Sequence, residues 1–497
     1  MKNGTGIFVM LLLALLTVNV GFIHAYSAST SNSFITIGTS GNEYGTTITN
    51  DKTYLYVSGY VYNSDTYYDI ITMKFDPSTN NIVWSKEIKG SSNDVAQGST
   101  ISSDGYLYLT GYTHTNSAGL DDAFIAKIDP STGSLVWFKT IDGTGEDMGY
   151  AICQSTADGY LYATGYTGSG GAGGYDIFIA KVDTNGNLVG FYTIGGSGND
   201  YGYGMACDDS GGIYVTGKTE SYGVGSGDIF IARFDSTKQQ VDWFTTIGST
   251  DSSYTDYGWG IVYGGDGYVY TTGIFGYGSN RANISVAKID SSTGNIVWFK
   301  VIGGGENDDQ GYSITYAPDG NLYLTGYTKS YGYGNEDVFI AMVNPSDGSV
   351  GWFKTMGGSN YERGLGIIVG PGNYLYASGR TSSYGEGSYD LFSSLVSDSL
   401  ANLTWTGGEG WDQVHVYNIV LNSITPSYSG NSYTVTLNSY TMTTTDQSFT
   451  VSDVSNSLTE HVAKDYSTPD PVPEPWLISV VIIGLSGILI LSFYRRD

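Results

Sequence analysis

A sevenfold repeat constrains this chain more than any other feature of its sequence. An apolar residue, Tyr, a variable residue, Thr or Ser, and Gly recur in that order, and the glycine stands at Gly59, Gly111, Gly165, Gly217, Gly273, Gly326 and Gly379. The spacings are 52, 54, 52, 56, 53 and 53 residues. A near-constant period of this length indicates a repeat architecture in which each copy is one structural unit.

Each repeat contains four short β-type runs separated by turn signals. In the third copy they are Gly149–Cys153, Tyr160–Thr167, Asp176–Asp183 and Leu188–Gly196. Asp-Gly and Asn-Gly steps between such runs predict antiparallel hairpins. No amphipathic helical pattern of useful length occurs between residues 30 and 465. Four strands in each of seven repeats predict an all-β fold, a seven-bladed β-propeller over residues 26–396.

Closure of the ring needs a seventh copy of the fourth strand. Six copies are anchored at Trp84, Trp137, Phe191, Trp243, Trp298 and Trp352. Phe34–Gly45 matches the same pattern but precedes the first blade, so we expect the N-terminus to supply the outer strand of the last blade and to leave no open edge. Leu403–Thr406 is the rival for this place.

The repeat resembles the SBBP family of β-propeller repeats. The segments that carry the resemblance are WFKTIGG, DGYLYLTGYT and DIFIAKID, and it covers about residues 34–396. The resemblance implies a propeller fold and an extracytoplasmic setting. It implies no common reaction.

The two ends of the chain read as targeting segments. Residues 1–25 have the charge, apolar run and small residues of a signal peptide. Residues 397–468 predict a β-rich stalk or accessory module, and residues 469–475 a stiff Pro-rich spacer. Residues 476–497 predict a transmembrane helix with Arg495 and Arg496 on the cytoplasmic side.

The C-terminal segment also resembles the PEP-CTERM sorting signal. Its motif residues are Pro473, Glu474 and Pro475, followed by the apolar run and a basic end. The resemblance implies a sorting peptidase of the exosortase or archaeosortase type as a partner, with the protein released or attached at the surface. The basic end is only two arginines before Asp497, which leaves retention as a membrane anchor open.

The acidic charge narrows the classes of partner. The 48 acidic and 21 basic residues give a formal charge of −27, which argues against binding nucleic acid.

The two cysteines, Cys153 and Cys207, stand four and five residues after equivalent glycines. Because side chains alternate along a strand, we expect them to point oppositely and favour two buried thiols over a disulfide.

One face of the predicted ring carries recurrent acids. One set precedes the first strands, and its members are weak Ca²⁺ candidates: Glu43, Asp94, Asp147, Asp200, Asp256, Asp309 and Glu362. A second set precedes the third strands: Asp69, Asp122, Asp176, Asp228, Asp337 and Asp390, with Asn283 in the remaining blade. Residues needed in every blade more often cap turns, so structural use is favoured over metal, and no other cofactor is expected.

Catalytic patterns find little support. The four histidines form no pair at ligand spacing, and each acid is one of a repeated set, whereas catalytic residues normally break a repeat's symmetry. Tyrosines in the Gly-rich loops between second and third strands are the better ligand-binding candidates: Tyr175, Tyr222, Tyr277, Tyr331, Tyr333 and Tyr384. Asn283 and Asn402 stand in glycosylation sequons.

These features favour an exported cell-surface propeller. Its expected role is binding, adhesion or envelope structure, with polysaccharide or protein partners and no catalytic residue. The alternative is an exported glycan hydrolase or lyase that uses the acidic face.

Overall fold

A computed structural model describes the ring and its C-terminal strands. It describes residues 33–396 except 39–40, 116–119, 250–254, 277–281, 304–307, 333 and 385–387, and beyond residue 396 the backbone of strands β29–β36. All of them belong to one compact unit, residues 32–497. The predicted signal peptide, the Pro473–Pro475 motif and Asn402 lie outside the described residues.

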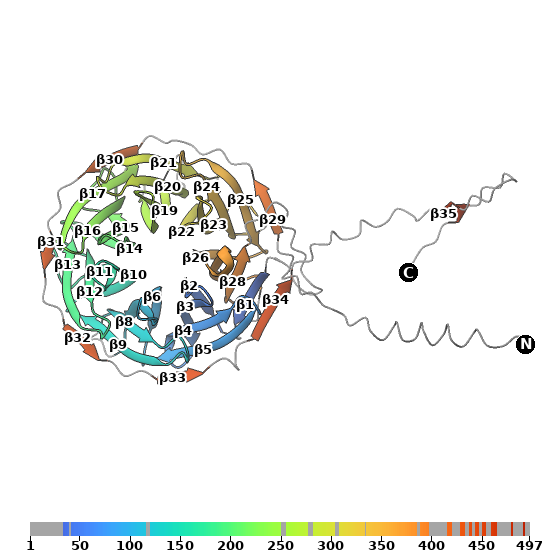
Figure 1. Ribbon diagram of the computed structural model, residues 1–497, viewed down its shortest axis with the longest axis horizontal. Helices are drawn as coiled ribbons and strands as arrows, with labels where there is room; N and C mark the ends of the chain where they lie inside the picture. Colours follow the sequence, from blue (N-terminus) through green and yellow to red (C-terminus); the bar gives the residue numbers. More distant parts are fainter. Residues whose placement is uncertain are drawn as a thin grey trace, which may run out of the picture. The chain divides into compact units, whose positions relative to one another are not determined.

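Seven antiparallel blades surround a central axis in the described part of the chain, as the repeat predicts (Figure 1). Blade 1 consists of β2 (Glu43–Asn50), β3 (Leu55–Asn63), β4 (Tyr67–Asp76) and β5 (Asn81–Lys89). Blade 2 consists of β6 (Asp94–Ile101), β7 (Leu107–Thr113), β8 (Asp122–Ile128) and β9 (Leu135–Asp142). Blade 3 consists of β10 (Asp147–Gln154), β11 (Leu161–Thr167), β12 (Asp176–Val182) and β13 (Leu188–Ile194). Blade 4 consists of β14 (Asp200–Cys207), β15 (Gly212–Thr219), β16 (Asp228–Asp235) and β17 (Gln240–Ser249). Blade 5 consists of β18 (Tyr257–Tyr263), β19 (Tyr268–Gly276), β20 (Ala282–Asp290) and β21 (Ile296–Ile302). Blade 6 consists of β22 (Asp309–Tyr316), β23 (Leu322–Thr328), β24 (Asp337–Val343) and β25 (Val350–Gly357).

The seventh blade is closed by the N-terminal strand. It consists of β26 (Glu362–Val369), β27 (Leu375–Thr381), β28 (Asp390–Val396) and β1 (Ser33–Gly38), with a 3₁₀ turn, η1 (Pro371–Asn373), between β26 and β27. β1 pairs antiparallel with β28, and Ile37 is opposite Leu391. The predicted seam is therefore confirmed. The rival segment Leu403–Thr406 lies outside the described residues.

The hydrophobic core lies between neighbouring blades. Side chains of second and third strands, mainly Tyr, Ile, Val, Phe and Ala, form clusters that each join two blades. Fourth-strand tryptophans add polar links, because the indole N–H groups of Trp84 and Trp298 donate to the carbonyls of Pro130 and Pro345 in the next blade, at 3.0 and 3.1 Å. Each blade is thus stabilised by its neighbours, as in other repeat folds.

The C-terminal segment adds a fifth strand to six of the seven described blades. Figure 1 shows these strands at the rim of the ring, and each pairs antiparallel with an outer blade strand. They are β29 (His415–Ile419) on β25, β30 (Tyr428–Ser432) on β17, β31 (Leu437–Ser439) on β13, β32 (Thr443–Asp446) on β9, β33 (Thr450–Asp453) on β5 and β34 (Thr459–Lys464) on β1. We call β29–β34 the belt.

The belt corrects the expectation of a stalk or accessory module over residues 397–468. The segment is β-rich as predicted, but its described strands pair with the blades instead of with one another. The physical reason is that six outer strands offer unpaired N–H and C=O groups, and an extended polar segment satisfies them.

The predicted membrane helix is not confirmed. Among the described residues, no helix is long and apolar enough to cross a membrane. The described parts of 476–497 are β35 (Ser479–Val480) and β36 (Leu491–Ser492), which pair antiparallel.

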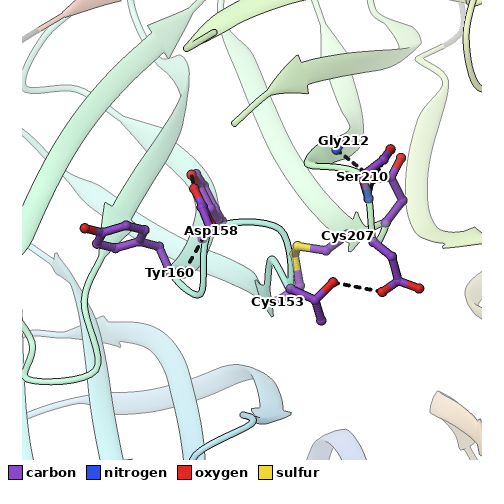
Figure 2. Close-up of a disulfide and its surroundings, with 10 residues drawn as sticks. Cys153, Asp158, Tyr160, Cys207, Ser210 and Gly212 are labelled. Atoms are coloured by element: carbon purple, nitrogen blue, oxygen red, sulfur yellow. Dashed lines mark hydrogen bonds between the residues drawn. A yellow bond between two sulfur atoms is a disulfide. The ribbon is translucent and has the colours of Figure 1, made fainter. Parts of the chain in front are cut away.

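The prediction of two free thiols is wrong. Figure 2 shows a disulfide that joins Cys153 of β10 to Cys207 of β14, with their Cα atoms 6.0 Å apart. Both side chains pack in the cluster between blades 3 and 4. Neighbouring blades meet through opposite sheet faces, so side chains that point oppositely within equivalent strands are the ones that meet between blades.

We expect the disulfide to stabilise the contact between these blades measurably. A Cys153→Ser/Cys207→Ser double variant should lose about 2–4 kcal/mol of unfolding free energy, because the bridge closes a loop of 54 residues. Chemical denaturation of the variant and of the reduced wild-type protein provides the measurement. Equal denaturation midpoints for the oxidised wild type and the variant would contradict the expectation.

Candidate binding site in the central channel

A β-bulge in every first strand places one side chain in the central channel. In blade 4, Gly202 pairs with Gly217 and Gly204 pairs with Thr216, so Tyr203 between them has no partner on β15. A bulge leaves its extra residue outside the ladder and turns the side chain. Equivalent bulges occur in all seven described blades, and the bulge residues are Thr46, Gln97, Tyr150, Tyr203, Trp259, Tyr312 and Leu365.

Small residues follow the bulges because first strands approach closely at the axis. A Cβ atom at Gly204 would lie 2.6 Å from the carbonyl oxygen of Trp259 in the next blade. A side chain there would push blades 4 and 5 apart. The glycine therefore permits the narrow ring on which the bulge side chains converge.

Four neighbouring bulge residues are aromatic, and this breaks the sevenfold symmetry. The ring centroids of Tyr150 and Tyr203 are 5.0 Å apart, those of Tyr203 and Trp259 4.3 Å, and those of Trp259 and Tyr312 5.7 Å. The four side chains form a continuous strip across blades 3 to 6, which we call the aromatic arc. The indole N–H of Trp259 is buried and has no hydrogen-bond partner among the described residues.

Two arginines of blade 7 line the channel next to the blade 6 end of the arc. Arg363 and Arg380 both line the cavity, and both act electrostatically on the pKa of Tyr312. Arg363 forms a two-point ion pair with Glu336, with one N–O distance of 2.9 Å, and lies over the ring of Tyr327. Arg380 instead lies beside the rings of Tyr44 and Tyr389, 5.2 and 5.1 Å from their centroids, which are 5.5 Å apart.

The channel encloses a cavity of about 620 Å³ with an unusual charge pattern. Such a volume is typical of sites for small ligands. The described residues that line it include Arg363 and Arg380 but no Asp or Glu. In a chain with 48 acidic residues and six arginines, this cavity is a local exception to the acidic composition.

Burial keeps the channel tyrosines neutral. It raises the pKa of Tyr150 to about 12 and raises the pKa values of Tyr203 and Tyr60 further. The pKa of Tyr312 is also raised by burial, although Arg363 and Arg380 lower it in part. At neutral pH these hydroxyls remain protonated and serve as hydrogen-bond donors and acceptors.

The loop tyrosines predicted from sequence lie outside the channel lining. The hydroxyls of Tyr222 and Tyr384 donate to the carbonyls of Gly195 and Gly357, and the ring of Tyr331 packs edge-on against Phe353. The ring of Tyr175 contacts those of Tyr166 and Tyr201. This placement gives Tyr222 and Tyr384 a structural use. Tyr277 and Tyr333 are outside the described residues.

The recurrent acids of the first set are buried caps. All seven are at most 1% exposed. Asp200 accepts hydrogen bonds from Gly196 N, Thr219 Oγ1 and Ser221 Oγ, and Glu362 accepts from Gly358 N and Thr381 Oγ1. Within the described residues no cluster of three or more metal-ligating side chains occurs. The contacts follow the structural interpretation, and calcium binding stays a prediction.

The second acid set lies beside the first. Asp176 and Asp228 each accept two loop N–H groups at Oδ2, while Oδ1 is buried without a hydrogen-bond partner. The first-set acid of the next blade is close in both cases. Besides burial, the charge of Asp200 raises the pKa of Asp176, and the charge of Asp228 raises the pKa of Asp256. Asn283 takes the same place within β20 and is 6% exposed, and its use as a glycan acceptor stays a prediction.

Two segments of the chain match the model of a known repeat family. Residues 192–223 and 297–334 match the family SBBP, described as a beta-propeller repeat. No curated protein matches the chain.

Several solved structures are similar at low identity. Sqt1 from Chaetomium thermophilum is 12% identical, with 72% of this chain and 99% of that chain covered and a TM-score of 0.39. The polysaccharide lyase Uly1 is 10% identical, with 71% and 90% covered and a TM-score of 0.44. The phage phi92 endosialidase is 10% identical, with 75% and 70% covered and a TM-score of 0.40. At these values no functional argument rests on them.

Proposed function

We propose that the chain is an exported binding propeller that holds a glycan in its central channel. The observation that carries this proposal is the aromatic arc, which lies in a cavity of about 620 Å³ and occurs in only four of the seven described bulges. Sugar rings stack on flat aromatic side chains, whose polar tips and neighbours accept and donate hydrogen bonds. The unpartnered indole N–H of Trp259 and the neutral tyrosine hydroxyls provide such groups.

Binding is better supported than turnover at this site. Most glycoside hydrolases use two carboxyl groups beside the scissile bond, and the described lining residues include none. A lyase needs a base whose pKa is near the working pH, whereas burial raises the tyrosine pKa values in the channel. The alternative of an exported glycan hydrolase or lyase is retained as an outcome of the test.

Export is part of the proposal. The disulfide between Cys153 and Cys207 supports it, because such bonds persist in oxidising compartments outside the cytoplasm. The signal-like residues 1–25 and the Pro473–Pro475 motif are consistent with surface display and with a sorting peptidase as a partner. Mass spectrometry of surface material tests the processing, and an intact peptide that contains Arg495 would contradict cleavage.

A glycan array followed by calorimetry tests the binding function. We expect Trp259→Ala to weaken binding of the array-selected glycan tenfold or more, which corresponds to about 1.4 kcal/mol. Gln97→Ala is the matched control, since Gln97 occupies the same bulge position outside the arc, and it should change affinity less than threefold. Equal affinities for wild type and Trp259→Ala would refute the site, and product release from the bound glycan would favour the enzymatic alternative.

A further inference from the structure

We infer that the glycan held in the channel carries a carboxylate and that Arg380 binds it. The inference rests on the proposed function and names the class of sugar, an oligosaccharide with a single uronate-type residue. It follows from the difference between the two arginines that line the cavity.

The charge of Arg363 is already neutralised within the protein. Its guanidinium pairs at two points with Glu336, which is 3% exposed. The pair fixes Arg363 against Tyr327 and Tyr312, at the end of the aromatic arc. Arg363 therefore contributes a rigid wall and no net charge.

Arg380 provides the net positive charge of the site. Among the described residues, no ion pair joins it to a carboxylate, and its Nε atom is buried with no hydrogen-bond partner. The neighbouring rings of Tyr44 and Tyr389 attract the guanidinium but do not neutralise its charge. A buried, unpaired donor is costly unless a ligand satisfies it.

The number and shape of the charges favour a carboxylate. The planar guanidinium matches a carboxylate with two parallel hydrogen bonds. One unpaired cation in the lining balances one negative charge, and the formal charge of −27 on the whole chain opposes ligands with several. A monoanionic sugar fits this balance better than a phosphorylated or densely sulfated one.

The arc and Arg380 lie at compatible places for one oligosaccharide. Tyr312 is the last member of the arc and lies within the electrostatic reach of Arg380. A sugar stacked on Trp259 or Tyr312 would therefore occupy the same cavity that Arg380 lines. Neutral sugars would use the arc but leave the charge of Arg380 without a counter-charge.

Matched glycans test the inference. A glycan array that contains uronate oligosaccharides, their carboxyl-reduced neutral counterparts and sulfated neutral oligosaccharides is screened first, and affinities are then measured by calorimetry. We expect carboxyl reduction to weaken binding tenfold or more. Arg380→Gln should abolish this preference and leave the binding of the reduced glycan within threefold of wild type. Arg380→Lys should retain an intermediate preference because it keeps the charge but not the planar fork.

Arg233→Gln serves as the charge control. Arg233 pairs with Asp242 on blade 4 outside the cavity lining, so this variant changes the net charge equally and should keep the preference. Equal binding of acidic and reduced glycans, tighter binding of the sulfated ones, or a preference that survives in Arg380→Gln would overturn the inference and leave glycan binding in place. If no glycan on the array binds, both proposals fail.

Discussion

Deletion of residues 33–38 is expected to lower the unfolding free energy of the propeller by about 5 kcal/mol, a large part of the stability of an ordinary domain. The segment is β1, which pairs with β28 on one side and with β34 of the belt on the other. Ile37 is 1% exposed and packs with Ile48, Leu55 and Leu391, so the cluster between blades 7 and 1 loses a member. Each lost apolar side chain costs roughly 2 kcal/mol, and the unpaired backbone groups add to this.

Thermal melting of three variants measures this effect. A protein that begins at residue 32 keeps β1 and should melt like the mature wild type, whereas one that begins at residue 39 should melt far lower and aggregate through the open edge of β28. The single change Ile37→Asp buries a charge in the same cluster and should destabilise without shortening the chain. An unchanged midpoint for the shorter protein would mean that another segment, such as Leu403–Thr406, closes the ring.

The ring was predictable because its determinants are local. Alternating apolar residues, Asp-Gly turns and the repeated glycine specify each hairpin, and the misplaced copy at Phe34–Gly45 specifies the seam. The position of the belt was not predictable, because short Ser- and Thr-rich strands show β propensity but do not indicate the sheet edge with which they pair. The disulfide was not predictable from strand alternation, because alternation gives the direction of a side chain within one blade. Cys153 and Cys207 instead meet between two neighbouring blades.

The channel site had a signal that depends on the bulge. The bulge residue stands three positions after each first-set acid, and it is the variable residue between two small ones. At Tyr150, Tyr203, Trp259 and Tyr312 it breaks the symmetry of the repeats, which is the property expected of functional residues. In a regular strand, the alternation of side chains would place this residue within the blade. The period of two therefore does not predict that it lines the channel, because the bulge changes the direction of its side chain.

The buried acids predict that the propeller is more stable at pH 4–5 than at pH 7. Burial raises the pKa values of Asp94 and Asp256 to about 7 and that of Asp69 to about 6, against an ordinary value of 3.8. Between pH 4 and pH 7 the folded chain therefore binds more protons than the unfolded chain at these groups. Their contribution to stability is full below about pH 4 and is lost as the pH rises through 6–7.

Two groups of carboxyls with opposite pKa shifts determine the pH at which the propeller is most stable. Turn acids such as Asp129 and Asp290 have lowered pKa values, because serine hydroxyls and backbone N–H groups donate to them, and their contribution is lost below about pH 4. The buried acids act in the other direction at higher pH. Each unit of pKa shift corresponds to about 1.4 kcal/mol, so several such groups lower the unfolding free energy by a few kcal/mol between pH 5 and pH 7.

Asp228→Asn provides the decisive variant. Asp228 uses Oδ2 for two loop N–H groups and buries Oδ1 without a partner, close to Asp256. An amide keeps the acceptor and removes the charge, and Asn283 already occupies the equivalent place in blade 5. We expect the variant to raise the melting temperature at pH 7 and to leave it nearly unchanged at pH 4, which flattens the dependence on pH.

Asp129→Asn is its matched control, because Asn344 fills the equivalent turn in blade 6 with the same contacts to a following serine. Asp129 lies in an exposed turn with a lowered pKa, so this variant should leave the slope between pH 5 and pH 7 as it is in the wild type. Calorimetric melting temperatures at pH 4, 5, 6 and 7 provide the test. A wild-type melting temperature that rises from pH 5 to pH 7 would show that the buried acids are ionised at little cost, for instance because a bound cation compensates their charge.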